Sequence, residues 1–231
     1  MCFIDFYLEM RVLFSRKLAF VAKPRCASTS VRRFLTKHID QNAEDFGIDV
    51  AGERKYFHPH MTAPYIRDLL SKYYSEKASA LEYFIVIRRP YEMLESYYKY
   101  FQPDENSNYN YSPNYSSGRM LFEDWIMNGK VGTNPEWHRR GPKWISCTNL
   151  TPLTLEAHIC NTENQPTVKN IFLIEEKAKL ERFLSDKFSI NVNLPHINQS
   201  SNQICIDRAL SNEAKSRVKM LFPLESSIYN L

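Results

Sequence analysis

Glycine is scarce in this sequence: the 231 residues include six, and none lies in the stretch AFVAKPRCASTSVRRFL at residues 19–35. Loops that hold ATP or GTP follow the pattern G-x-x-x-x-G-K-[ST], in which glycine lets the backbone approach the phosphates closely. The stretch at 19–35 does not have that pattern, although it runs from an apolar segment into a helical one. ATP or GTP hydrolysis is therefore disfavoured.

Three further features are missing. The cysteines form an odd set of five without a C-x-x-C pair, which disfavours zinc or a disulfide scaffold and favours a reducing compartment. No uninterrupted apolar run reaches the roughly 18 residues of a membrane span, and no signal peptide is visible, so we expect a cytoplasmic protein. A net charge of +4 suits a small anionic ligand or an acidic substrate. It falls well short of the net charge that is typical of a nucleic-acid-binding protein.

The length predicts a single domain over 1–231, with its core over about 17–231. Short apolar runs rich in β-branched and aromatic residues predict strands at 17–22, 82–87 and 170–175, with a shorter fourth at 54–59. Helical patterns alternate with the strands and continue after them, at 30–39, 64–74, 91–101, 119–129, 176–188 and 207–221. This alternation predicts an α/β fold of three layers, with a central, mostly parallel sheet flanked by helices.

One long segment has no hydrophobic periodicity. Residues 102–118, QPDENSNYNYSPNYSSG, are polar and rich in Asn, Ser and Tyr. We interpret them as a loop, which is either a lid on the acceptor side of a site or a disordered excursion.

Residues 24–30, PRCASTS, follow the first predicted strand and open its helix; we call them the PRCASTS loop. Unpaired N–H groups and the dipole at a helix N-terminus favour a phosphate or sulfate, and the loop adds hydroxyl groups and a cation. Residues 88–91, the RRPY turn, end the second strand and open its helix, which carries Ser96. Arg88 is then placed at the carboxyl end of a strand, where open α/β sheets bind ligands.

Together, these two motifs resemble those of PAPS-dependent sulfotransferases, above all the carbohydrate-type branch that includes heparan sulfate 2-O-sulfotransferase, and related bacterial-type enzymes. PAPS is 3′-phosphoadenosine 5′-phosphosulfate. The PRCASTS loop resembles the family's P-K-x-[GA]-S-T-S without a gap, and IVIRRPYEMLESYY resembles its apolar strand, R-[DN]-P-[YF], and following Ser and Tyr. Four more segments resemble the family in the same order: HPHMTAPYIRDLL, FEDWIMN, NIFLIEEKAKLERFLSDKF and LPHINQS.

The resemblance implies a P-loop-like sulfotransferase fold and the transfer of a sulfuryl group from PAPS, without a metal, to a hydroxyl of a carbohydrate or small metabolite. The first motif would hold the 5′-phosphosulfate end of PAPS, and the Arg and Ser of the second its 3′-phosphate. The cofactor-binding residues implied are Arg25, Cys26, Ala27, Ser28, Thr29, Ser30, Arg88 and Ser96.

Three positions depart from the family pattern. Arg25 stands where the family has its catalytic lysine, and Lys23, two residues earlier, is the alternative for that role. Ala27 replaces the commoner glycine. Arg89 replaces the usual acid before proline, which removes a charge that could orient Arg88.

Histidine is the side chain best suited to take a proton from a hydroxyl near neutral pH. His60 aligns with the family's catalytic histidine, and His58 in the same segment is the alternative. The resemblance also places His138 and Lys143 of EWHRRGPKW, and His196 of LPHINQS, near the cofactor or the acceptor.

Two other functions compete with this interpretation. A nucleotide or small-molecule kinase on a related sheet would need Mg²⁺ and ATP, and the missing Gly-Lys-Ser/Thr counts against it. A basic nucleic-acid-binding module would use Tyr97, Tyr98, Tyr100 and the tyrosines at 109–115 as a stacking surface. Tyrosines at helical spacing are more simply explained as core, and we expect no nucleic-acid partner.

Overall fold

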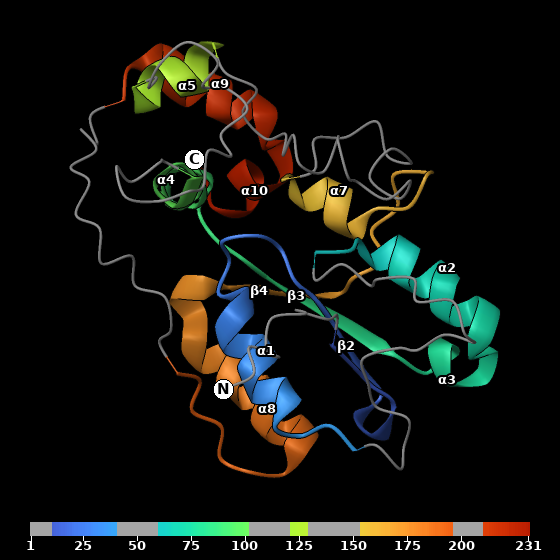
Figure 1. The fold of residues 1–231 in the computed structure, drawn as a ribbon. Helices are drawn as coiled ribbons and strands as arrows, with labels where there is room; N and C mark the ends of the chain where they lie inside the picture. The colour runs from blue at the N-terminus through green and yellow to red at the C-terminus, as the bar shows by residue number, and fades with distance from the viewer. Residues whose placement is uncertain (1–10, 41–59, 102–120, 129–152, 196–209) are drawn as a thin grey trace, which may run out of the picture.

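A computed structural model describes residues 11–40, 60–101, 121–128, 153–195 and 210–231 of the chain. These residues form an α/β structure with a four-stranded sheet in the order β1-β2-β3-β4 (Figure 1). The strands are β1 (Arg11–Leu13), β2 (Leu18–Val21), β3 (Glu82–Ile87) and β4 (Asn170–Leu173). β2, β3 and β4 are parallel neighbours, and β1 pairs with β2 in the antiparallel direction.

Alternate side chains of the strands enter two separate apolar clusters, one on each face of the sheet. Leu18 and Phe20 of β2 pack with Phe84 on one face, and Ala19 and Val21 pack on the other. Both faces are buried, which is why these strands are nearly continuous apolar runs in the sequence.

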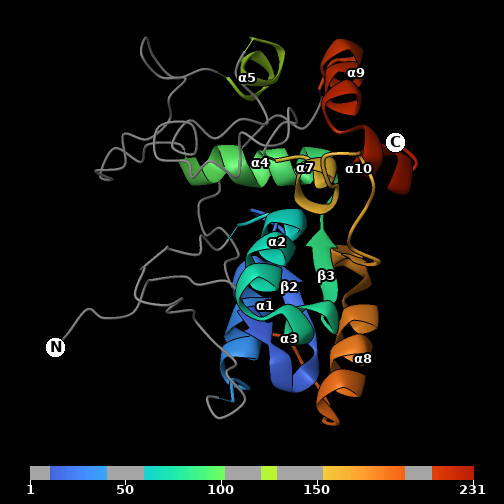
Figure 2. The same ribbon diagram turned by 90° about the vertical axis from the view of Figure 1, so that its right-hand side faces the viewer.

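Helices cover both faces (Figures 1 and 2). α1 (Ser28–Thr36) and α8 (Lys177–Phe188) contribute Val31, Leu35, Leu180 and Leu184 to the cluster around Phe84. On the other face lie α2 (Ala63–Tyr73), α3 (Ser75–Ser79) and α7 (Leu155–Ile159). Two short 3₁₀ turns, Phe14–Arg16 and Ile174–Glu176, follow β1 and β4.

Four helices lie beyond the carboxyl ends of the parallel strands: α4 (Pro90–Phe101), α5 (Phe122–Asn128), α9 (Asn212–Leu221) and α10 (Pro223–Ile228) (Figure 2). Tyr97 of α4 is stacked on Trp125 of α5 at a ring distance of 6.2 Å, and Tyr98 contacts the same tryptophan. Both tyrosines are buried. They are therefore core residues, and a stacking surface for nucleic acid does not include them.

The predicted strands at 17–22, 82–87 and 170–175 are confirmed, as are the α/β class and the helices on both sides of the sheet. The predicted helices that lie wholly in the described residues are present, with ends that differ by at most three residues. Local patterns did not predict β1, α3, α7 or α10. The predicted strand at 54–59 and the loop at 102–118 lie outside the described residues. No helix among the described residues is long and apolar enough to cross a membrane.

Candidate functional site

The PRCASTS loop joins the end of β2 to the start of α1, and its backbone has an unusual conformation. Arg25 and Ala27 have φ angles of 60° and 55°, in the left-handed region that glycine occupies most easily. The first helical hydrogen bond runs from Val31 N to Ala27 O at 3.3 Å, so the N–H groups before Val31 have no acceptor within the helix. A left-handed residue followed by a helix turns successive N–H groups toward one side, as anion-binding loops do.

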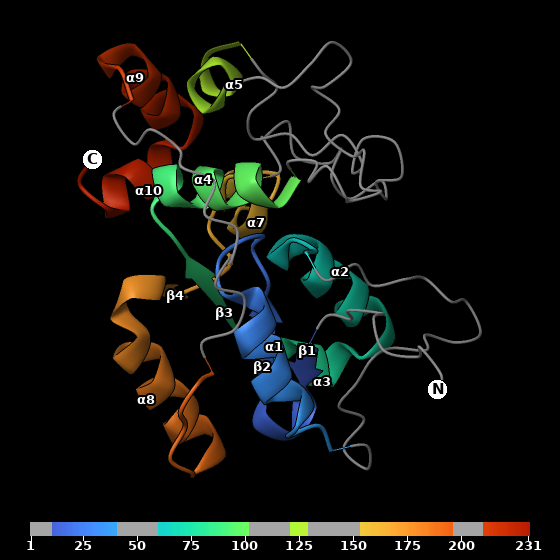
Figure 3. The same ribbon diagram turned by 60° about the vertical axis from the view of Figure 1, so that its left-hand side comes forward.

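Side chains bring the loop and helix α4 together. Arg25 is half-buried, and its Nε donates a hydrogen bond to Ser96 Oγ at 3.1 Å. Ser28 and Ser30 are buried at the first turn of α1, and Thr29 between them is half-buried. Because β2 and β3 are parallel neighbours, the PRCASTS loop and the RRPY turn lie at the same edge of the sheet (Figure 3). The two motifs that the sequence separates are therefore adjacent in space.

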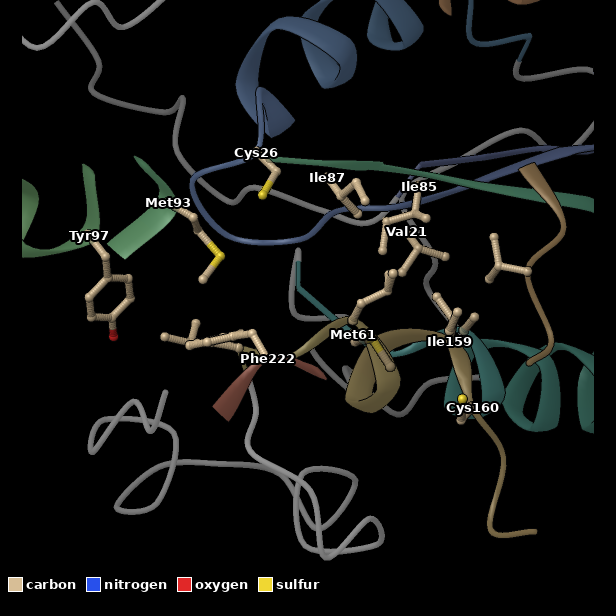
Figure 4. Close-up of a cluster of buried hydrophobic side chains, with 14 of the residues drawn as sticks. Val21, Cys26, Met61, Ile85, Ile87, Met93, Tyr97, Ile159, Cys160 and Phe222 are labelled. Atoms are coloured by element: carbon tan, nitrogen blue, oxygen red, sulfur yellow. The ribbon is translucent and has the colours of Figure 1, made fainter. Parts of the chain in front are cut away.

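Cys26 has a structural environment. Its side chain points from the loop into the apolar cluster that contains Ile87, Met93 and Phe222 (Figure 4). Burial raises the pKa of the thiol, while the charge of Lys23 and a hydrogen bond with the Arg88 backbone act in the opposite direction. A protonated, enclosed thiol is unsuited to nucleophilic chemistry. If Cys26 contacts a ligand, the contact is therefore made by its backbone.

The RRPY turn places its two arginines differently. Arg88 Nε lies 3.3 Å from Glu92 Oε2, one helical turn further along, and both side chains are partly exposed. The guanidinium of Arg89 lies over the ring of Tyr229, 5.6 Å from its centroid. Glu92 thus provides Arg88 with a carboxylate partner, although the acid expected before the proline is replaced by Arg89.

His60 also lies at this edge of the sheet. Its Nδ1 is 2.5 Å from the carbonyl oxygen of Ala22, the residue after β2. A carbonyl oxygen only accepts, so Nδ1 carries the proton and donates, and Nε2 of the neutral ring carries the lone pair. This is the tautomer that a general base acting through Nε2 requires.

Lys23 has an internal environment instead. Its Nζ lies 3.3 Å from Glu225 Oε1, 2.9 Å from Met93 Sδ, and within hydrogen-bonding distance of Leu153 O. The side chains of Lys23 and Glu225 are fully enclosed. Burial raises the pKa of Glu225, and the charge of Lys23 opposes that effect. Lys23 therefore contacts α10 and Met93 of α4 in the interior, whereas Arg25 contacts Ser96 of α4.

A buried histidine completes this internal cluster. His158 Nδ1 lies 2.8 Å from the Thr154 carbonyl oxygen. Burial and then the charge of Lys23 lower the pKa of His158 to about 3. The ring therefore stays neutral at physiological pH.

The remaining predicted residues, His58, His138, Lys143 and His196, lie outside the described residues. Within the part of the chain that the structure describes, no three His, Cys, Asp or Glu side chains are grouped as metal ligands.

Sequence reasoning missed three residues that contact these segments. Glu92 could have been found, because its spacing of four from Arg88 on a predicted helix is typical of an ion pair. Glu225 and Tyr229 carry no local signal, since their partners lie far away in the chain.

Comparisons of the chain with protein-family models, with curated proteins and with solved structures found no match.

Proposed function

We propose that the chain is a PAPS-dependent sulfotransferase with a P-loop-like sulfotransferase fold. It moves the sulfuryl group from PAPS to a hydroxyl of a carbohydrate or small metabolite. The observation that carries this proposal is the contact between Arg25 and Ser96, which joins the two candidate anion-binding motifs at one edge of the sheet. Two such motifs side by side suit a nucleotide that has phosphates on both its 3′ and 5′ positions.

Each motif has a separate task in this proposal. The N–H groups of the PRCASTS loop, with Ser28 and Thr29, bind the phosphosulfate end. Arg88 and Ser96 bind the 3′-phosphate, since guanidinium groups form paired hydrogen bonds with phosphate oxygens. Arg88 is paired with Glu92 in this structure. The 3′-phosphate would then either displace Glu92 from Arg88 or bind Arg88 beside it.

The reaction is an in-line displacement at sulfur, with a loose transition state like that of phosphoryl transfer. The acceptor oxygen forms a bond to sulfur while the bond between sulfur and the bridging oxygen of the 5′-phosphate breaks. The acceptor proton moves to Nε2 of His60, and adenosine 3′,5′-bisphosphate leaves. Catalysis of this kind depends mainly on position and electrostatic stabilisation.

We assign the stabilisation of the leaving phosphate to Arg25. Its guanidinium supplies charge and several donors, although it does not give up a proton as a lysine does. Lys23 is bound to Glu225 in the interior, which favours Arg25 over Lys23. His58 remains the alternative base, and His138, Lys143 and His196 remain candidates for the acceptor side.

Thermal unfolding with adenosine 3′,5′-bisphosphate, AMP and ATP tests this function. A ligand at a hundred times its Kd stabilises the folded state by about 2.7 kcal/mol, so we expect the bisphosphate to raise Tm by several degrees and AMP to raise it less. Arg88→Gln is expected to remove the preference for the bisphosphate over AMP. Arg33→Gln changes an exposed arginine of α1 and is the matched control. Equal shifts with all three nucleotides, or none, would contradict the proposal.

A further inference from the structure

The C-terminal helix α10 and the residue that follows it contact the ends of the strands that lead into both candidate phosphate-binding segments. Glu225 of α10 forms the buried ion pair with Lys23, which lies two residues before Arg25. The same carboxylate oxygen, Oε1, accepts a hydrogen bond from Leu155 N at 2.7 Å, where α7 begins. The entry to the PRCASTS loop is thus attached to α10 and α7 by one carboxylate.

The second attachment is at Tyr229, directly after α10. Its hydroxyl lies 3.3 Å from the carbonyl oxygen of Ile87, the residue before Arg88, and 2.8 Å from Glu175 Oε2 just after β4. The Tyr229 ring also lies beneath the guanidinium of Arg89. One residue therefore contacts the ends of β3 and β4 and a side chain of the RRPY turn.

A buried ion pair is a poor way to gain stability alone. Well-packed apolar residues of similar volume often stabilise a fold as well or better, because they avoid the loss of hydration of two charges. Ion pairs and hydrogen bonds are directional, so they fix the distance and angle between the segments that they join. The Lys23–Glu225 pair and the Tyr229 hydroxyl act at the two strand ends that open into the anion-binding motifs.

We propose that Glu225 and Tyr229 are positioning residues, which hold the PRCASTS loop and the RRPY turn at the spacing that one doubly phosphorylated nucleotide requires. Neither side chain contacts the nucleotide. The inference rests on the proposed function for its ligand, adenosine 3′,5′-bisphosphate.

Single substitutions give the first test. We expect Glu225→Gln to raise the Kd of the bisphosphate about tenfold or more, because small displacements of binding groups are costly, and Tyr229→Phe to raise it by about threefold. Glu82→Gln is the matched control. Glu82 pairs with Lys187 at the opposite end of β3, so this change is expected to leave the Kd within about twofold of the unmodified protein.

Glu225→Gln alone leaves Lys23 buried without its counter-charge and lowers Tm, so weaker binding could reflect damage to the fold. The double variant Lys23→Met with Glu225→Gln separates the two effects. It removes both charges, retains an acceptor for Leu155 N, and is expected to recover most of the lost Tm. If these residues position the motifs, the Kd stays raised about fivefold or more despite that recovery. Recovery of the Kd together with Tm overturns the inference.

Amide hydrogen exchange provides a readout that needs no nucleotide. In the double variant we expect faster exchange in peptides that cover the PRCASTS loop, and unchanged exchange in α8. If the unmodified protein does not bind the bisphosphate, the proposed function fails while the exchange result still decides whether α10 orders the loop. Unchanged exchange in the loop overturns the inference whether or not the bisphosphate binds.

Discussion

Ala27 occupies a backbone conformation that favours glycine, and this explains the commoner glycine in the motif that the loop resembles. With a φ of 55°, its Cβ approaches the following carbonyl oxygen. We expect Ala27→Gly to raise the free energy of unfolding by up to about 1 kcal/mol, because the relief of strain exceeds the extra entropy of the unfolded chain.

Chemical denaturation measures this difference. Ala178→Gly is the control, because Ala178 is exposed within the right-handed helix α8. There glycine is expected to lower the free energy of unfolding by about 0.5–1 kcal/mol. A loss of stability in both variants would show that the left-handed residue carries no strain.

The role of Arg25 can be tested by substituting lysine, the residue that the resembling motif has at this position. We expect Arg25→Lys to turn over PAPS at least as fast as the unmodified protein, because an ammonium group can both neutralise the leaving oxygen and give it a proton. Arg25→Gln keeps hydrogen-bond donors but loses the charge, and is expected to slow turnover about a hundredfold or more. The measurement is release of adenosine 3′,5′-bisphosphate over a panel of glycan and small hydroxyl acceptors. Equal turnover in Arg25→Gln would exclude a role for the charge.

His158 makes stability depend on pH. Its pKa is about 3 in the folded protein against 6.5 for an ordinary histidine, so between these values the unfolded chain binds a proton that the folded chain does not. Between about pH 6.5 and pH 3 the free energy of unfolding therefore falls as pH falls, by up to about 1.4 kcal/mol per pH unit from this residue.

Denaturation at several pH values in the acid range tests this dependence. His158→Gln is expected to flatten the slope, even though it lowers stability near neutral pH. His38→Gln is the comparison: burial lowers the pKa of His38 as well, but its side chain is less enclosed, so this variant is expected to flatten the slope less than His158→Gln does. A slope that is the same in all three proteins would mean that His158 takes up its proton in the folded state.

At the scale of elements, α4 supplies the side-chain hydroxyl that meets Arg25. Ser96 lies in the second turn of this helix. We expect Ser96→Ala to raise the Kd of adenosine 3′,5′-bisphosphate about tenfold, since a hydrogen bond to a charged group contributes about 1.5–3 kcal/mol. The Kd of AMP is expected to change by less than about threefold, because AMP lacks the 3′-phosphate.

Isothermal titration with both nucleotides measures these affinities. Ser71→Ala removes an exposed hydroxyl of α2 and serves as the matched control. Equal losses for AMP and the bisphosphate would place Ser96 away from the 3′-phosphate.

The elements that could be predicted from the sequence are those with a strong local pattern. EYFIVI is a continuous run of β-formers, and Pro64 marks the start of α2 as expected for a first-turn proline. β1 is only three residues long, too short to show a period, and it is defined by its pairing with β2. α10 has a glutamate at a buried position, which a local pattern assigns to the surface, and its distant partners Lys23 and Leu155 N explain its burial.

In the candidate site, too, one part could be predicted from the sequence and another part depends on distant residues. Adjacent parallel strands made the approach of the PRCASTS loop and the RRPY turn predictable, because carboxyl ends of parallel strands share one edge. The different orientations of Lys23 and Arg25 were not predictable. Both are cations in the same loop region, and their different environments come from distant partners: Glu225 of α10 for Lys23 and Ser96 of α4 for Arg25.

At the scale of the whole molecule, the sheet collects at one edge three segments that lie far apart in the chain: the PRCASTS loop, His60, and the RRPY turn with α4. His60 is attached to the end of β2 through Ala22 O. In the proposed function, nucleotide binding and proton transfer belong to different segments, so a substitution is expected to separate them.

We expect His60→Ala to lower the transfer rate about a hundredfold to ten-thousandfold, since a positioned general base contributes that much. The Kd of adenosine 3′,5′-bisphosphate is expected to stay within about threefold, because the two motifs proposed to bind the phosphates are unchanged. Single-turnover transfer from PAPS and titration with the bisphosphate measure the two quantities separately. His58→Ala tests the alternative base. If both variants transfer at the original rate, neither histidine is the base, whereas equal losses of rate and affinity in His60→Ala would make His60 a support of the loop.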